Sequence, residues 1–280
     1  MVTRQAVDLL LITLCQSRPA RLRAALTQSL IECPKKTGLK TAVILSPDRP
    51  TPAVRDVCHS WQDHPGVLYR PLPFPLVSPE GGQRWIEGRN WLLGEADAAG
   101  ITARWQSNYD DDWQWGPGWD EHLPKMLNDD GVDAWEAVSL VLWDRLDDAG
   151  LDVNLRQYHW SPLIGRYQTG WRFDTRLTNQ ITKQCPGRRA EMPFFLLDFG
   201  TVSSTERRAM YRKYMRAGKT CNYVKRYVQT PIRKPLDWIL KKFPDPAKFK
   251  AWQIERLLKE GILSNAKSTK HALPQGPRGT

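Results

Sequence analysis

The chain has 280 residues, of which 41% are hydrophobic and 25% are charged, so it is long enough to bury the core of one large domain and is not a disordered protein. Its five cysteines are an odd number, widely spaced and without a Cys-x-x-Cys pair, which argues against a zinc or redox motif. They indicate reduced thiols in a cytoplasmic protein, located in the host cytoplasm if the chain is viral.

The net charge of +11 at pH 7 is unevenly distributed along the chain. Residues 206–280 contain 19 lysines and arginines against 5 aspartates and glutamates, a net charge of +14, whereas residues 1–205 carry a net charge of −3. The basic side chains of this C-terminal quarter are interleaved with tyrosines, a mixture suited to nucleic-acid phosphates and bases. The positive charge of the C-terminal quarter therefore predicts a polyanionic partner.

Predicted strands and helices alternate through the first hundred residues. Apolar runs favour buried strands, and apolar residues at helical spacing between turn signals favour helices. The N-terminal run contains Asp8 and lacks a clear small-residue cleavage site, so we interpret it as a strand rather than a signal peptide. In chain order the predictions are strand 9–15, helix 20–31, strand 41–46, helix 54–61, strand 67–72, helix 83–99 and strand 101–107.

The alternation predicts an α/β fold with a mostly parallel central sheet covered on both faces. No stretch approaches the roughly 20 apolar residues needed to cross a bilayer, so any membrane contact is expected to be peripheral. No oligomeric state is predicted. The later elements are helix 119–127, strand 134–143, an antiparallel segment at 155–164, strand 194–199, and helices 206–217, 236–243 and 246–260. The predicted parts are an α/β domain at 1–203, a basic helical appendage at 204–263 and a disordered tail at 264–280.

Three consecutive carboxylates, Asp110–Asp112, follow the strand predicted at 101–107. Ligands bind at the carboxyl ends of the strands in open α/β sheets. Asp110 and Asp112 are one residue apart, so both can turn toward one hard cation, which can in turn hold a diphosphate. A solvated acidic turn is the alternative for a bare charge run, and the order of the flanking segments favours the metal site.

This order of segments resembles the nucleotide-sugar glycosyltransferases of the GT-A class, family-two-like members in particular. Leu11–Leu22 resembles their opening strand and Arg-x-x-Arg-Leu helix start, and Gly88–Asn90 resembles the Arg-Asn helix that leads into their metal motif. The resemblance implies a GT-A, Rossmann-like sandwich fold for the α/β domain. It also implies transfer of a sugar from a nucleotide-sugar donor to a hydroxyl acceptor.

The resemblance assigns Asp110 and Asp112 to a divalent Mn or Mg ion that bridges the donor phosphates, with Asp111 as a neighbour able to exchange roles with either. The chain departs from the family at the catalytic base, for which it has no clean copy. Glu191 and Asp198 are the candidates for an inverting mechanism, in which a carboxylate deprotonates the acceptor hydroxyl. Asp198 can also complete the metal shell, and a retaining mechanism stays open.

The nucleotide side of the site is likewise carried over from the resemblance. Ser17 and Arg18 lie on the first strand-to-helix turn, where they reach the nucleotide. Asp48 matches the position that contacts the base or ribose, and its alternative role is a helix or turn cap. Arg89 matches a diphosphate-side or base-side arginine, and its alternative role is a surface salt bridge.

Two tryptophans beside the acidic residues are candidates for the acceptor side. Trp115 and Trp119 flank Gly116, Pro117 and Gly118, a segment predicted to be a mobile loop. Large aromatic side chains more often pack in the core, but core packing is less expected beside such a loop, so these two rings are the candidates for stacking on a sugar or a base.

The acceptor itself is predicted from charge. A hydroxymethylated base in DNA, flipped out or single-stranded, is the preferred acceptor. The alternative is an anionic membrane surface with a lipid-linked or surface glycan, suggested by aromatic residues and lysines between residues 238 and 252. A third reading is a non-enzymatic nucleic-acid-binding protein. The basic residues assigned to the acceptor are Arg207, Arg208, Arg212 and Lys213.

Overall fold

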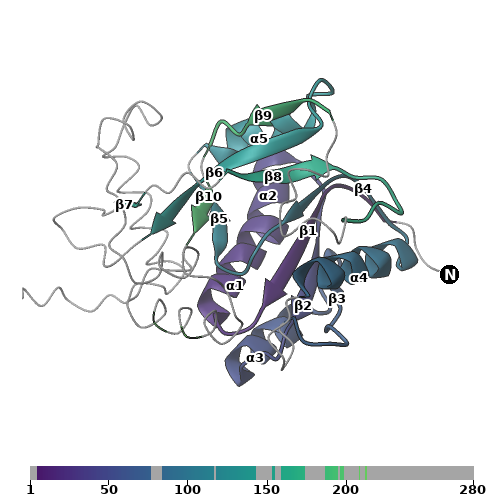
Figure 1. Cartoon of the computed structure of the whole chain (residues 1–280), viewed down its shortest axis with the longest axis vertical. Helices are drawn as coiled ribbons and strands as arrows, with labels where there is room; N and C mark the ends of the chain where they lie inside the picture. The colour runs from purple at the N-terminus through teal and green to yellow at the C-terminus, as the bar shows by residue number, and fades with distance from the viewer. Residues whose placement is uncertain are drawn as a thin grey trace, which may run out of the picture.

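A four-stranded parallel sheet forms the N-terminal half of the fold (Figure 1). The computed structural model describes residues 5–76, 84–116, 118–142, 153–154, 159–173, 187–194 and 196–198, with the single residues Arg208 and Arg212. The parallel strands lie in the order β3 (Val67–Tyr69), β2 (Thr41–Pro47), β1 (Gln5–Cys15) and β4 (Ile101–Asn108). The chain builds outward from β1 to β3 and then crosses back to add β4 on the other side of β1. This is the arrangement of an open α/β sheet.

One face of this sheet is covered by three helical segments. The first runs as α1 (Pro19–Thr27), a π-helical turn η1 (Gln28–Glu32) and α2 (Cys33–Thr37), and it ends at Gly38, whose φ of 73° is left-handed. The other two are α3 (Pro52–Trp61) and α5 (Trp119–Leu127). The helical run is therefore longer than the helix predicted at 20–31, since it continues to Thr37. Pro34 does not end it, because it lies in the first turn of α2, where its missing N–H costs little.

The opposite face is covered by α4 (Trp85–Ala98). Leu92, Leu93 and Ala96 of α4 are fully buried and pack with Leu10 and Ile12 of β1. The sheet thus has an apolar core on each face, as the alternation of strands and helices predicted.

The second half of the sheet is mixed. The antiparallel β8 (His159–Arg166) lies between β4 and β6 (Ala134–Leu142), which confirms the antiparallel segment predicted there. β10 (Leu196–Asp198) runs parallel to β6 and antiparallel to β5 (Trp113–Trp115), a strand that was not predicted. Two short strands complete the sheet beside β6, namely β7 (Val153–Asn154) and β9 (Arg189–Glu191).

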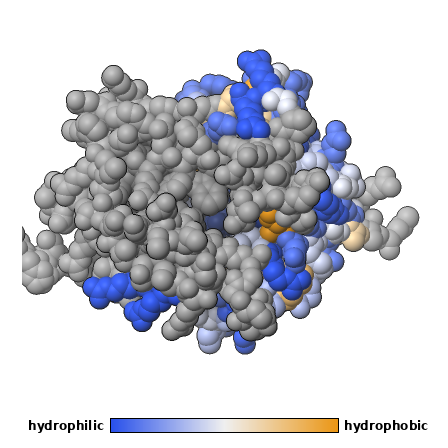
Figure 2. Space-filling model, viewed as in Figure 1, coloured by the Kyte–Doolittle hydropathy of each residue, from blue (hydrophilic) through white to orange (hydrophobic). Residues whose placement is uncertain are grey.

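The fold class is therefore α/β with a mostly parallel N-terminal sheet. The surface of the described residues is mainly hydrophilic in the view of Figure 2. Among the described residues, the large hydrophobic side chain that is exposed is Ile31, at 46%. Within the described part of the chain no helix has the length and apolar character to cross a membrane. The helices predicted beyond residue 203 and the tail lie outside the described residues, apart from Arg208 and Arg212, which are helical and exposed.

Candidate nucleotide and metal site

The carboxyl ends of β1, β2 and β4 meet at one edge of the sheet. Cys15, the last residue of β1, lies opposite Pro47 of β2, and Ile12 lies opposite Asn108 of β4. The strand order reverses between β1 and β4, so the edge of the sheet beyond these two strands is the topological switch point, the place at which open α/β sheets bind ligands. The turn after β1 and the acidic residues after β4 both lie there.

The acidic residues form a tight turn between β4 and β5, here called the acidic turn (Asp110–Asp112). Before it, the Tyr109 amide donates to the Ile12 carbonyl at 2.9 Å, which fixes the end of β4 against β1. Across it, the Trp113 amide donates to the Asp110 carbonyl at 3.1 Å. The three carboxylates are thus presented by a short turn whose entry is anchored to the central strand.

Arg18 binds two of these carboxylates from the turn after β1. Its guanidinium contacts the Asp112 carboxylate and lies 3.6 Å from an Asp111 oxygen, and the side chains of Arg18, Asp111 and Asp112 are all between 10% and 14% exposed. The Gln16 amide also donates to Asp111, at 3.4 Å. The predicted proximity of the first turn to the acidic residues is therefore present, whereas Ser17 is exposed beside them.

Burial raises the pKa of Asp111 to about 7. The Arg18 charge opposes this shift, and the neighbouring carboxylates of Asp112 and Asp110 add to it. Burial therefore disfavours the charged form of Asp111 more than the Arg18 guanidinium favours it, and an additional positive charge beside it would favour the carboxylate.

Arg89 reaches the same turn from α4. Its terminal nitrogen lies 3.8 Å from an Asp110 oxygen, and the two side chains are 13% and 36% exposed, so Arg89 forms a partly buried salt bridge with the acidic turn. Burial lowers the pKa of Arg89, opposed by the Asp110 charge. Its Nε is buried and has no hydrogen-bond partner among the described residues, which leaves a donor for an anionic ligand.

Asp48 lies at the end of β2 and is 6% exposed. Its amide donates to the Cys15 carbonyl at 2.9 Å, and its carboxylate lies 3.4 Å from Nε of Arg49. The N-cap of α3 is Thr51, whose side chain accepts from the Val54 amide. The alternative role of Asp48 as the cap of that helix is therefore wrong, and its carboxylate is held at the same edge of the sheet as the acidic turn.

The carboxylates fit a hard divalent cation in donor type, because such cations take oxygen ligands. They also fit in charge, since three neighbouring carboxylates stand together there, and a bound cation would lower the pKa of Asp111, which burial raises. In the described conformation Arg18 and Arg89 face them, and no group of three His, Cys, Asp or Glu side chains converges as a metal cage in the described ranges. A cation bound by Asp111 and Asp112 would compete with the guanidinium of Arg18 for these carboxylates.

The two candidate bases lie at different places along β6. Asp198 of β10 is paired with Trp113, the residue that follows the acidic turn, and with Val141 of β6. Glu191 of β9 is paired with Glu136, which lies five residues before Val141 on β6. Along the strand this separates the two pairing positions by ~16 Å. The backbone thus brings Asp198 beside the acidic turn and sets Glu191 apart from it.

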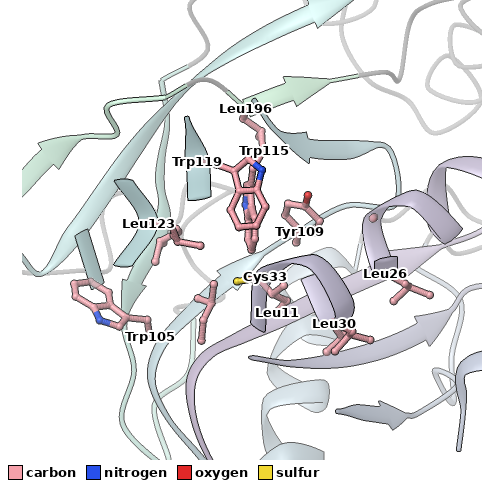
Figure 3. Packing of buried hydrophobic residues seen from close by; sticks show 14 of the residues in the cluster. Leu11, Leu26, Leu30, Cys33, Trp105, Tyr109, Trp115, Trp119, Leu123 and Leu196 are labelled. Atoms are coloured by element: carbon pink, nitrogen blue, oxygen red, sulfur yellow. The ribbon is translucent and has the colours of Figure 1, made fainter. Parts of the chain in front are cut away.

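The predicted stacking role of Trp115 and Trp119 is wrong. Trp115 is 0% exposed and Trp119 is 2% exposed, and their ring centroids are 5.1 Å apart within the apolar core (Figure 3). The glycines beside them suggested an open loop, but Trp115 is in β5 and Trp119 begins α5. Both rings are enclosed by the core and do not reach an acceptor.

Sequence reasoning missed two residues at the site. Asn108, the last residue of β4, is 1% exposed, and neither polar atom of its amide has a hydrogen-bond partner among the described residues. Its signal was an amide at the end of a strand, two residues before the first carboxylate of the acidic turn. Gln28 also contacts the residues that flank the acidic turn, and it lies inside a predicted helix with no local signal for this contact.

No family model and no curated protein matches the sequence of this chain. The structure of S. aureus TarS aligns at 15% identity and a TM-score of 0.39, over 79% of this chain and 42% of TarS. TarS 1-349 in complex with UDP-GlcNAc aligns at 13% identity and a TM-score of 0.38, over 79% of this chain and 70% of that one.

TarS 1-349 in complex with UDP aligns at 13% identity and a TM-score of 0.36, over 91% of this chain and 77% of that one. The chain thus spans less than half of the longer TarS structure. These values establish no family membership. What the chain binds is therefore inferred from its own residues.

Proposed function

We propose that the chain is a metal-dependent glycosyltransferase that uses a nucleotide-sugar donor. The observation that carries this proposal is the meeting of the acidic turn with Arg18 and Arg89 at the switch point of the sheet. Carboxylates for a cation and arginines for phosphates are the groups that a nucleoside diphosphate requires. Both kinds of group lie where an open α/β sheet binds nucleotides.

Each residue then has a role in binding the donor. Asp110 and Asp112 hold the Mn or Mg ion, with Asp111 beside them, and the bound ion neutralises charge that develops on the leaving diphosphate. Arg18 and Arg89 bind phosphate oxygens, for which the planar guanidinium is suited. Asp48 accepts hydrogen bonds from the ribose or base at the neighbouring strand end, and the exposed Ser17 lies on the nucleotide side.

We assign the catalytic base to Asp198 rather than Glu191, because the register places Asp198 opposite Trp113. In an inverting reaction this carboxylate takes the proton of the acceptor hydroxyl as the hydroxyl oxygen attacks the anomeric carbon. The bond between that carbon and the phosphate oxygen breaks, and the nucleoside diphosphate leaves with the bonding electron pair. The acceptor oxygen becomes the new glycosidic oxygen.

The preferred acceptor is a hydroxymethylated base in DNA, in a cytoplasmic reaction. The support is the net charge of +14 over residues 206–280. Phosphate binding by clustered lysines and arginines supplies most non-specific affinity for DNA. Arg207, Arg208, Arg212 and Lys213 are assigned to this contact, and a lipid-linked or surface glycan at an anionic membrane is the alternative acceptor.

The test is turnover of a panel of nucleoside diphosphate sugars with Mn, with and without hydroxymethylated DNA. We expect turnover that requires Mn, is stimulated by this DNA, and is lost in Asp112→Asn. The matched control is Asp130→Asn, an equal change at a side chain that is 85% exposed. Turnover that is indifferent to DNA moves the acceptor to a glycan, and an absence of sugar-nucleotide binding favours a non-enzymatic nucleic-acid-binding protein.

A further inference from the structure

Gln28 connects the two ends of the acidic turn. Its side-chain oxygen accepts hydrogen bonds from the Tyr109 hydroxyl at 2.7 Å and from the Trp115 amide at 2.8 Å. Its side-chain nitrogen donates to the Trp115 carbonyl at 3.0 Å. Tyr109 directly precedes the acidic turn, and Trp115 lies three residues after it, so one amide group holds both flanks.

The orientation of this amide follows from its partners. A backbone N–H only donates and a backbone carbonyl only accepts, so the contacts with Trp115 require the Gln28 oxygen and nitrogen as they stand. If the amide were rotated, its nitrogen would face the Trp115 N–H, a second donor, and its oxygen would face the Trp115 carbonyl, a second acceptor. Gln28 is 0% exposed, which makes each mismatch costly because water cannot replace the lost partner.

The local backbone explains how Gln28 reaches the turn. Gln28 is the first residue of the π-helical turn η1, in which the Cys33 amide donates to the Gln28 carbonyl. The extra residue in a π-helical turn changes the direction of the side chains that follow an ordinary helix, and such turns occur frequently at functional sites. Gln28 lies between Leu26 and Leu30, whose side chains are packed into the apolar core with Tyr109 and Trp115 (Figure 3).

We propose that Gln28 is a positioning residue that fixes the acidic turn for the cation and the diphosphate. The identity of the bound cation and diphosphate rests on the proposed function, whereas the contacts of Gln28 with Tyr109 and Trp115 do not. Gln28 is not a ligand, since its three hydrogen bonds go to Tyr109 and Trp115. It acts by keeping the carboxylates between these two residues in the arrangement that receives a cation.

The test compares Gln28→Met, which keeps the length of the side chain and removes all three hydrogen bonds, with Tyr109→Phe, which removes one. The matched control is Ser29→Ala, the next residue of η1, whose buried hydroxyl has no partner among the described residues. Hydrogen exchange of residues 109–115 is measured without metal, and the Kd for Mn²⁺ with a nucleoside diphosphate is measured by calorimetry.

We expect Gln28→Met to speed amide exchange across the acidic turn and to weaken Mn²⁺–diphosphate binding, each by about tenfold, with a smaller effect of Tyr109→Phe and none of Ser29→Ala. The Gln28 and Tyr109 effects on Kd are expected to be less than additive, because the two residues share one hydrogen bond. A general loss of stability would instead speed exchange throughout the sheet.

Exchange and Kd values in Gln28→Met that match those of Ser29→Ala would overturn the proposal. If Gln28→Met does not fold, Tyr109→Phe decides by the same two measurements. If the wild-type chain binds neither Mn²⁺ nor the diphosphate, the proposed function is wrong, and hydrogen exchange alone decides whether Gln28 fixes the turn.

Discussion

The guanidinium of Arg18, in the turn after β1, contacts the carboxylate of Asp112, in the turn after β4. The same guanidinium lies 3.6 Å from Asp111, so one cation serves two buried carboxylates. If the acidic turn binds a divalent ion, as proposed, that ion would compete with Arg18 for the same negative charge, and Arg18 would then be available to the phosphates of the donor.

The first prediction concerns this competition. Replacing Arg18 by glutamine removes the competing charge, so Arg18→Gln binds Mn²⁺ alone about tenfold more tightly than the wild type. The same variant binds the nucleoside diphosphate more weakly, because it has lost a phosphate ligand. Calorimetric titration with each ligand separately measures both effects.

Arg104→Gln is the control for this experiment, since Arg104 lies on β4 and pairs with the exposed Asp130. It is expected to leave both affinities unchanged. Weaker binding of Mn²⁺ to Arg18→Gln than to the wild type would show that the guanidinium supports the cation instead of competing with it.

The second prediction concerns pH and the stability of the metal-free chain. Folding raises the pKa of Asp111 from 3.8 to about 7, so the folded chain binds a proton that the unfolded chain has released between these values. The contribution of Asp111 to the free energy of unfolding therefore falls as the pH rises from about 4 to about 7. Asp111→Asn removes this loss and keeps an acceptor for the Gln16 amide.

Asp111→Asn is accordingly expected to raise Tm above that of the wild type by about 5 °C at pH 8 and by less at pH 5. Thermal unfolding with a chelator present measures the difference. Asp130→Asn, at an exposed position, is the control and shows no such dependence. An equal gain at both pH values would mean that Asp111 does not carry the raised pKa.

The N-terminal half of the fold was predictable because its signals are local. Continuous apolar runs such as Leu9–Cys15 predict buried parallel strands, and the helix and strand before the acidic turn follow from ordinary periodicity. Once the strand order is known, the contact of the turn after β1 with the acidic turn follows from the rule that carboxyl ends share one edge.

The other half of the site was not predictable, because it depends on contacts distant in sequence. The pairing of Asp198 with Trp113 joins strands more than 80 residues apart. The contact of Gln28 with Trp115 likewise spans 87 residues. Trp115 and Trp119 were expected to be exposed because they flank a glycine- and proline-containing loop, but tertiary packing decides burial, and it places both rings in the core.

The third prediction tests whether Trp119 has a packing role in the core. Trp119 is 2% exposed and packs against Trp115, so Trp119→Ala leaves a cavity and costs about 3–5 kcal/mol of stability. Trp119→Phe retains most of the packing and loses less. Denaturant unfolding measures the two losses, and acceptor KM is measured on the phenylalanine variant.

Because Trp119 does not reach the acceptor, Trp119→Phe is expected to leave the acceptor KM unchanged. A variant with wild-type stability and a raised acceptor KM would restore the stacking role and contradict its place in the core.

The fourth prediction concerns the basic C-terminal quarter. If Arg208 and Arg212, both exposed, neutralise DNA phosphates, replacing both by glutamine makes the salt dependence of DNA binding shallower by about one counterion per lost contact. Fluorescence anisotropy of labelled DNA at several salt concentrations measures this slope for the full chain.

Arg23 and Arg55 are also exposed, and they belong to α1 and α3. Replacing both by glutamine makes the same change in net charge and is expected to leave the slope unchanged. Equal slopes for the two double variants would show that net charge, and not a defined basic surface, attracts the DNA.

The central claim is that the acidic turn binds the diphosphate of a sugar nucleotide through a divalent cation. Calorimetric titration of the full chain with a panel of nucleoside diphosphate sugars, with and without Mn²⁺, tests it most directly. We expect at least one of these donors to bind only when Mn²⁺ is present, with affinity lost in Asp112→Asn and kept in Asp130→Asn. Binding that is the same in Asp112→Asn as in the wild type, or no binding of any donor, would contradict the claim.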